Sequence, residues 1–444
     1  MFNTNLSKII LLLLVAVVTS GTVFSDTNWP SWRGPNGNSV SSSKLLPTKW
    51  SDKENIAWKI PVAGDGASSP CIWGDSVFLT TQDDEKLMAL KFDFKTGKNL
   101  WSKELSTGEA IRDPLRGQPG DQRRRQKFHK LHNLASPSPV TDGKAVVFLF
   151  GNGDLACANF EGTILWKKNL QKDQGVFTIW WGYANSPLIH DNLVICTVMQ
   201  DSLEDLEGEK AQSFLIAYDI NTGKEVWKTP RKTIANAESC DSYTTPIYHN
   251  AAKQTQIILM GGNQLDAYDP NTGKQLWKKE GLNGGRTITG PTIEQNTVFA
   301  TQGMRGPLVA INLDKSSGLP ANEKAVWEYT KNTPDSCCPV GTNGLIFIVS
   351  DNGFAQCLDA NNGTSYWNER IGGDYKSSPL ACNGKIYFTN LEGICTVVDA
   401  TKTFTVIAKN SLGEGVIASP AVSQDHLLIR TRKSLICIGN PFSN

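Results

Sequence analysis

The stretch AYDINTGKEVW at residues 217–227 recurs almost unchanged as AYDPNTGKQLW at residues 267–277. In each copy Asp is followed by Asn-Thr-Gly after one residue, and Trp comes four residues after Gly. An Asp side chain can hydrogen-bond turn backbone and Gly tolerates positive φ, so each copy predicts a tight turn between two β-strands. Weaker copies end at Trp101, Trp166, Trp327 and Trp367, and an eroded copy at residues 397–408 lacks the Trp.

A second repeated element precedes these copies, in which a small residue and Pro introduce an alternating apolar run. The small residue occurs eight times, at Ser69, Ser138, Ser186, Thr245, Gly290, Cys338, Ser378 and Ser419. The eighth unit has no Trp strand after it, but residues 56–61, which include Trp58, supply one from the other end of the chain. The pattern predicts an all-β, eight-bladed β-propeller of four-stranded antiparallel blades, closed by an N-terminal strand that completes the last blade.

The composition agrees with many short strands joined by turns. The chain has 444 residues, with 39 Gly, 21 Pro and 20% charged residues, and 39% of its residues are hydrophobic. That hydrophobic content is sufficient for a packed core, which excludes wholesale disorder. The formal net charge of +1 provides no global field that would recruit nucleic acid or an anionic membrane surface.

The amino terminus has the form of a secretory signal peptide. Lys8 precedes an apolar run at residues 9–18, and small and polar residues follow up to Ser25. We expect residues 1–25 to be removed by cleavage after Ser25, with an uncleaved membrane anchor as the alternative. The first cysteine is Cys71, so no Cys for lipid attachment follows the cleavage site. The mature chain is therefore expected in the periplasm or outside the cell, with no transmembrane segment.

The rest of the chain divides into an N-terminal extension at residues 26–55 and the propeller at residues 56–444. We expect the extension to pack on the ring, because Trp29, Trp32 and Trp50 would otherwise form an exposed apolar cluster. It is thus predicted to belong to the folded unit.

Ten cysteines are present, and most lie within apolar strand-like runs such as those around Cys196 and Cys437. In such a run Cys behaves as a small buried hydrophobe. No Cys-x-x-Cys occurs, and the five His residues show no zinc-ligand spacing with the cysteines. The sequence therefore predicts neither a disulfide framework nor a zinc site.

Long insertions fall mostly in the loops between blades and between the second and third strands of a blade, which emerge on one face of a propeller. They cover residues 106–135, 168–184, 200–212, 229–243 and 279–288, whereas the expansion at 312–325 belongs to the opposite face. We place the binding surface on the first face, called here the elaborated face. Candidates for lining the channel mouth there are His129, His132, Trp180, Trp181, Tyr183, Arg231, Asp241, Tyr243, Arg286 and Arg305.

The Asp-x-x-Thr-Gly-x-x-x-Trp repeats resemble those of pyrroloquinoline quinone (PQQ) β-propellers. That family includes quinoprotein alcohol dehydrogenases and the non-enzymatic outer-membrane assembly lipoprotein BamB. The resemblance covers residues 56–440, and the opening WPSWRGPN at residues 29–36 also resembles the start of exported propellers of this kind. A propeller fold of this type hosts more than one function.

The quinoprotein resemblance implies a cofactor site with PQQ and calcium. Cations would bind the PQQ carboxylates and an aromatic ring would stack on it, while carboxylates would hold Ca²⁺ and accept the alcohol proton. The adjacent Cys337 and Cys338 resemble the vicinal disulfide that covers the quinone, but Cys338 also fills the small-residue position before Pro. The candidates are Arg231, Arg286, Arg305, Trp180, Trp181, Cys337 and Cys338 for the quinone, Glu238 and Asp241 for the metal, and Asp241 for the base.

Two functions follow from these patterns. The first is an exported, non-catalytic binding or scaffold protein of the cell envelope, whose elaborated face takes an envelope protein, a peptide, or a small molecule at the channel mouth. The alternative is a PQQ- and Ca²⁺-dependent alcohol or sugar dehydrogenase. The chain is short for that enzyme group, which usually carries extra loops around the cofactor, so the binding function is preferred. A nucleic-acid partner is not expected.

Overall fold

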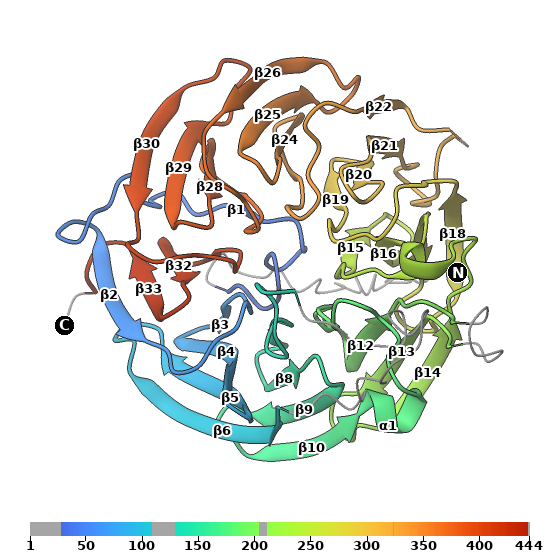
Figure 1. Cartoon of the computed structure of the whole chain (residues 1–444), viewed down its shortest axis with the longest axis horizontal. Helices are drawn as coiled ribbons and strands as arrows, with labels where there is room; N and C mark the ends of the chain where they lie inside the picture. The colour runs from blue at the N-terminus through green and yellow to red at the C-terminus, as the bar shows by residue number, and fades with distance from the viewer. Residues whose placement is uncertain (1–27, 109–128, 204–210, 323, 443–444) are drawn as a thin grey trace, which may run out of the picture.

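The computed structural model describes residues 28–108, 129–203, 211–322 and 324–442. Eight β-sheets surround a central axis like the blades of a propeller (Figure 1). Each blade has four antiparallel strands, consecutive in the chain in seven blades, while the eighth takes its outermost strand from near the N-terminus. This confirms the predicted eight-bladed, all-β architecture. The described residues contain only two short helices, α1 (Leu170–Gln174) and the 3-10 helix η2 (Ala237–Cys240).

The first four blades lie in chain order around the ring. Blade 1 contains β3 (Cys71–Trp73), β4 (Ser76–Asp83), β5 (Lys86–Asp93) and β6 (Asn99–Thr107). Blade 2 contains β7 (Val140–Thr141), β8 (Ala145–Leu149), β9 (Asp154–Asn159) and β10 (Ile164–Asn169). Blade 3 contains β11 (Leu188–His190), β12 (Leu193–Val198), β13 (Phe214–Asp219) and β14 (Glu225–Pro230). Blade 4 contains β15 (Ile247–Asn250), β16 (Thr255–Gly261), β17 (Gln264–Tyr268) and β18 (Gln275–Glu280).

The other four blades complete the ring. Blade 5 contains β19 (Thr292–Glu294), β20 (Thr297–Thr301), β21 (Leu308–Asn312) and β22 (Trp327–Tyr329). Blade 6 contains β23 (Val340–Thr342), β24 (Leu345–Val349), β25 (Phe354–Asp359) and β26 (Ser365–Arg370). Blade 7 contains β27 (Leu380–Cys382), β28 (Lys385–Thr389), β29 (Ile394–Asp399) and β30 (Val406–Ser411). Blade 8 contains β31 (Ala421–Ser423), β32 (His426–Arg430), β33 (Ser434–Ile438) and β2 (Ile56–Pro61).

Strand β2 closes the ring, as the sequence predicts. It pairs antiparallel with β33, with Trp58 opposite Cys437 and Ile60 opposite Leu435. The strand near the N-terminus is thus the outermost strand of blade 8, whose three inner strands come from the C-terminal end of the chain. Joining both termini in one sheet ties the last blade to the first through the chain itself.

The repeated turn has two roles in the fold. Oδ1 of Asp219 accepts hydrogen bonds from both the backbone N and Oγ1 of Thr222, each at 2.8 Å. Gly223 follows with a φ of 67°, and a Cβ added there would lie 2.8 Å from the ring of Trp166 on the preceding blade. Glycine therefore allows the left-handed turn and also leaves space for the neighbouring indole.

The repeated Trp residues join adjacent blades. The Trp101 indole Nε1 donates to the carbonyl oxygen of Phe160 at 3.0 Å, and Trp327 donates to Ala360 at the same distance. The expanded turn of blade 5 changes this contact for Trp277. Its Nε1 donates to Oε1 of Gln256, whose amide in turn donates to the carbonyl oxygen of Ser317. A side-chain amide thus bridges the gap that the expansion creates.

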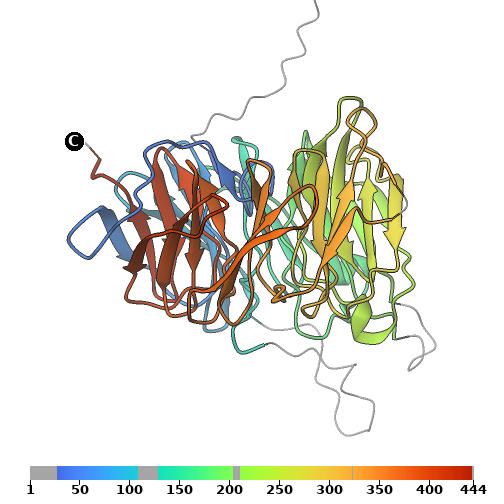
Figure 2. The same cartoon turned by 90° about the horizontal axis from the view of Figure 1, so that it is seen from above.

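Residues 29–41, called here the plug segment, cross the ring at one end of the channel. Trp29 pairs with Ile72 in blade 1, and β1 (Val40–Ser41) pairs parallel with β27 in blade 7. Between them, Arg33 is fully buried against blades 5 and 6. The segment is the blue trace across the middle of Figure 1, and Figure 2 shows it near the upper face.

The first 27 residues, including the predicted signal peptide, lie outside the described residues. Within the part of the chain that the structure describes, no helix has the length and apolar character needed to span a membrane.

Candidate functional site

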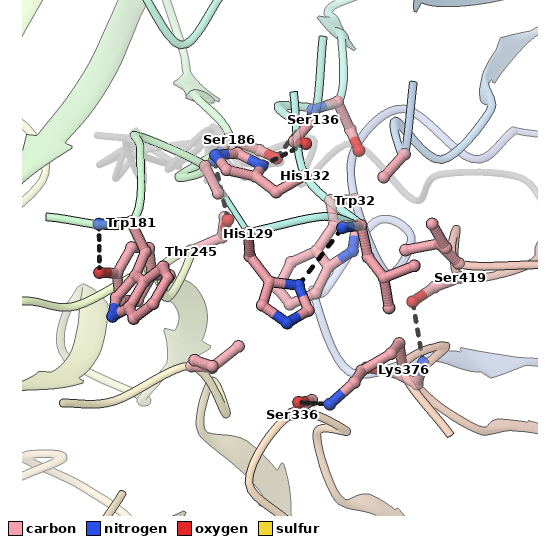
Figure 3. A pocket seen from close by; sticks show the side chains of 18 of the residues that line it. Trp32, His129, His132, Ser136, Trp181, Ser186, Thr245, Ser336, Lys376 and Ser419 are labelled. Carbon is pink, nitrogen blue, oxygen red and sulfur yellow. Dashed lines mark hydrogen bonds between the residues drawn. The ribbon is translucent and has the colours of Figure 1, made fainter. Parts of the chain in front are cut away.

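A cavity of about 290 Å³ lies on the propeller axis (Figure 3). Small residues before the inner-strand prolines line it, together with residues two positions earlier in the chain, such as Ser136 and Ser336. The plug segment instead contacts residues that follow those prolines, such as Ile72 and Thr292. The plug segment therefore closes one end of the channel, and its Trp32 forms the base of the cavity. The cavity opens toward the blade-linking loops of the elaborated face.

Hydrogen bonds between neighbouring blades explain most of the small residues that precede the prolines. The backbone N of Ser138 donates to Oγ of Ser186 at 3.0 Å. The same bond recurs around the channel except at Gly290, which has no side chain, and at Ser69, whose Oγ has no partner among the described residues. Five further bonds are Ser69 N to Ser138 Oγ, Ser186 N to Thr245 Oγ1, Gly290 N to Cys338 Sγ, Cys338 N to Ser378 Oγ and Ser378 N to Ser419 Oγ. The side-chain hydroxyl, or the sulfur at Cys338, is therefore what links these blades.

Trp181 forms part of the cavity wall on the blade 2 to blade 3 linker. Its backbone N donates to the hydroxyl of Tyr243 at 3.2 Å, and its Nε1 donates to Oε1 of Glu238 at 3.0 Å. Its ring centroid lies 5.3 Å from that of Trp180 and 6.3 Å from that of His129. The orientation of this indole is therefore set by hydrogen bonds on both its backbone and its side chain.

Among the described residues, two cations line the cavity, and both are paired with carboxylates. Arg286 lies 3.2 Å from Asp335 and 3.6 Å from Glu238. Lys376 lies 2.6 Å from Asp351 and donates to Oγ of Ser336 at 2.9 Å. These pairs join the linkers of neighbouring blades on the elaborated face. They leave the cavity without an excess of positive charge.

The two histidines at the cavity are held in the neutral form. Burial lowers the pKa of His129, and the nearby charges of Lys376, Lys130 and Arg286 lower it further. Burial likewise lowers the pKa of His132 to about 4, although a hydrogen bond with the backbone of Gly182 acts in the opposite direction. Near pH 7 neither imidazole adds charge to the site.

The structure brings two of the sequence-predicted cofactor and metal residues to the cavity, Trp181 and Arg286. His129, His132 and Tyr243, which sequence analysis placed among the residues at the mouth, also line it. The lining residues that were not anticipated include Trp32, Asp335 and Lys376. Trp32 was noticed only as an apolar residue of the extension, and no motif marks the other two.

Asp241 and Arg231 face the interior of the protein. Asp241 accepts hydrogen bonds from the backbone N of Trp180 at 2.8 Å and of Asp201 at 2.9 Å, and burial raises its pKa to about 8. Arg231 is buried in an ion pair with Asp266 at 3.0 Å. Neither side chain lines the cavity, and each holds a loop of the elaborated face against the blades.

The other nominated residues also lie away from the cavity. Arg305 is exposed on the strand-connecting turn of blade 5, and its backbone carbonyl accepts a hydrogen bond from Thr333. The Cys337 thiol donates to the carbonyl oxygen of Ser377 at 3.3 Å, and Cys338 belongs to the hydrogen-bonded ring. All ten cysteines are buried free thiols. Among the described residues, no group of three or more His, Cys, Asp or Glu is arranged to hold a metal ion.

Comparisons with known proteins support this fold. The family model of the outer membrane protein assembly factor BamB matches residues 119–369 and 318–406. Comparison with curated protein sequences gives no match.

Solved structures with the same fold include both classes of protein that the repeats resemble. BamB from Moraxella catarrhalis has a TM-score of 0.59 at 14% identity, over 86% of this chain and 99% of that one. A europium-containing methanol dehydrogenase has a TM-score of 0.61 at 13% identity, over 93% and 91% of the two chains. The quinohemoprotein alcohol dehydrogenase from Comamonas testosteroni has a TM-score of 0.65 at 10% identity, over 94% and 81%. At these identities the likeness concerns the fold alone.

Proposed function

Because this chain belongs to the PQQ-repeat β-propeller family of the outer-membrane assembly factor BamB, we propose that it is an exported, non-catalytic binding protein of the cell envelope. Its elaborated face takes the partner, an envelope protein or peptide. The observation that carries this proposal is the pairing of both cavity cations, Arg286 and Lys376, with carboxylates. Such paired charges position and recognise a partner.

Export is inferred from residues 1–25, which have the sequence of a cleaved signal peptide but lie outside the described residues. A cut after Ser25 would release a chain that begins just before the plug segment. The expected location is the periplasm or the medium outside the cell.

Exposed apolar side chains on the elaborated face supply contacts for a protein partner. Val176 is 48% exposed, Ile234 is 61% exposed and Met304 is 55% exposed. They lie on the linkers that follow blades 2 and 3 and on a strand connection of blade 5. Exposed apolar residues on the face that carries the cavity supply contacts for another macromolecule.

The residues at the cavity do not fit a calcium-held quinone. Calcium takes six to eight oxygen ligands, whereas Asp335 is the one carboxylate among the described residues that line the cavity, and it pairs with Arg286. Cys337 and Cys338, which would cover a quinone, do not line the cavity. This donor set favours the binding function over the alcohol or sugar dehydrogenase.

Site-specific photo-crosslinking in the native cell envelope tests the docking face. p-Benzoylphenylalanine at Ile234 and at Met304 is expected to capture the same discrete envelope protein. The control position is Leu319, which is 43% exposed on the opposite face and should not capture it. Equal capture from all three positions, or capture from none, would contradict the proposed face.

A thermal melt of the same protein with PQQ and CaCl₂ tests the dehydrogenase alternative. A ligand that binds only the native state raises the melting temperature in a saturable way. We expect no such rise. A saturable rise would replace the binding function with the enzymatic one.

A further inference from the structure

The Ser and Thr hydroxyls that link the blades have protons that they do not donate to any described protein group. Five of its hydroxyls line the cavity, and each accepts a backbone N–H from the preceding blade. A hydroxyl that accepts one hydrogen bond still has its own proton to donate. Among the described residues, these five hydroxyls donate no hydrogen bond to a protein group. They are Ser138, Ser186, Thr245, Ser378 and Ser419.

The charges around this ring disfavour an anionic ligand. Arg286 and Lys376 pair with Asp335 and Asp351, and Glu238 adds a further carboxylate 3.6 Å from Arg286. An anion entering the cavity would lose hydration without gaining an unpaired cation. The neutral histidines do not change this balance. The cavity therefore suits a ligand that has no net charge but many hydrogen-bonding groups.

Aromatic and aliphatic side chains provide the apolar part of the site. Trp32 closes its base and Trp181 forms a wall, and Figure 3 shows both around the same space as His129. Leu131, Ile288 and Ile417 also line the cavity. A flat indole beside a ring of hydroxyls matches a molecule with an apolar ring face and a polar edge. The volume of about 290 Å³ lies at the lower end of the range of about 300–1,000 Å³ for ligand sites, which suits one ring-sized unit.

From these features we infer that the cavity binds a neutral saccharide unit. The ring face of the sugar packs against Trp181, and its hydroxyls accept from the Ser and Thr ring and exchange hydrogen bonds with the Arg286–Asp335 pair. A longer saccharide extends from the cavity toward the elaborated face. This inference rests on the proposed function, because it takes the cavity to be a binding site, and it identifies the chemistry that the site selects.

Calorimetry and saturation-transfer NMR on the full chain test the inference directly. The probes are glucose, N-acetylglucosamine, cellotriose and chitotriose, with glucuronate, glucose 6-phosphate and PQQ as anionic counterparts. We expect at least one neutral probe to bind, and the anionic form of the same sugar to bind more weakly. Failure of all four neutral probes, or tighter binding of an anionic probe, would overturn the inference.

Two variants locate the binding. Trp181→Ala should weaken binding of the neutral probe roughly tenfold or more, as truncation of a central aromatic contact does, and Trp181→Phe should restore part of it. The matched control is Ile234→Ala, an exposed residue of the same face that does not line the cavity. Equal binding by the Trp181→Ala and Ile234→Ala proteins would place the sugar elsewhere and contradict the proposal. Loss of sugar binding with intact crosslinking from Ile234 and Met304 would remove this inference but leave the proposed function standing.

Discussion

Arg33 in the plug segment donates a hydrogen bond from Nη2 to the carbonyl oxygen of Pro339 at 2.6 Å, across 306 residues of sequence. Its Nη1 donates to the carbonyl oxygen of Pro291 at 2.9 Å, so one guanidinium joins blades 5 and 6. Burial lowers the pKa of Arg33, and its bonding partners are uncharged oxygens. The extension is therefore fixed to the ring by hydrogen bonds from Arg33 to two backbone carbonyls, which accept from no other side chain in the part of the chain that the structure describes.

Truncation of Arg33 should destabilise the whole propeller. Arg33→Ala leaves the carbonyls of Pro291 and Pro339 buried without this donor, and we expect it to lower the free energy of unfolding by about 2–4 kcal/mol. Arg33→Lys should recover only part of this loss, because one ammonium lacks the forked geometry of the guanidinium. Denaturant unfolding provides the measurement. Equal stability of the wild type and Arg33→Ala would show that the plug segment contributes little to the fold.

A pair of glycine variants can separate packing from backbone strain. Gly273 has a φ of 68°, and an added Cβ would lie 2.4 Å from the Trp227 ring. Gly281 has a φ of 83°, and an added Cβ would meet nothing within 4 Å. Both alanine variants share the cost of a left-handed conformation, but only Gly273→Ala also displaces the indole.

We expect Gly273→Ala to lower the free energy of unfolding by about 1–3 kcal/mol more than Gly281→Ala does, which is the usual cost of overpacking. Denaturant titrations of the two variants under the same conditions give this difference. If the two variants lost the same stability, the left-handed turn alone would explain the glycine at 273. The contact between the turn and the Trp ring would then contribute nothing to the free energy of unfolding.

The fold could be predicted from the sequence because its repeated turns are local, whereas the site could be predicted only in part. Asp219, Thr222 and Gly223 make a turn whose bonds span four residues, so the pattern is visible in the chain. Lys376 and Asp335 line the same cavity only because the ring brings their linkers together, and no spacing in the sequence predicts this. Asp241 shows the converse: its loop position suggested a site, but its carboxylate turns inward to bind backbone N–H groups.

His132 should make the stability of the protein depend on pH. Its pKa in the folded protein is about 4, below the value of about 6.5 in the unfolded chain. Between these values the unfolded state binds the proton and the native state does not, so the contribution of His132 is complete above pH 6.5 and is lost as pH falls toward 4. The full contribution is on the order of 3 kcal/mol.

The readout is the difference between the wild type and His132→Gln. Asp241, whose pKa burial raises to about 8, contributes stability that falls as pH rises from about 4 toward 8, and this opposes His132 over the same range. The contribution of Asp241 cancels in the comparison, because both proteins contain it. Unfolding at several pH values should show the wild type losing more stability than His132→Gln on acidification. Parallel curves would mean that His132 titrates normally in the folded protein.

The ten cysteines allow a direct test of the pair at 337 and 338. All ten are buried free thiols, and burial holds the pKa of Cys337 well above its ordinary value, with the nearby carboxylate of Asp351 acting in the same direction. Since the thiolate is the reactive form, a thiol reagent should label none of them rapidly in the native protein. After unfolding in guanidinium chloride without reductant, all ten should react.

A count of eight reactive thiols would indicate one disulfide, and peptide mapping that placed it at Cys337–Cys338 would support the quinoprotein resemblance. A count of ten would leave Cys338 as a member of the ring that links the blades, where its sulfur replaces the hydroxyl of the other units.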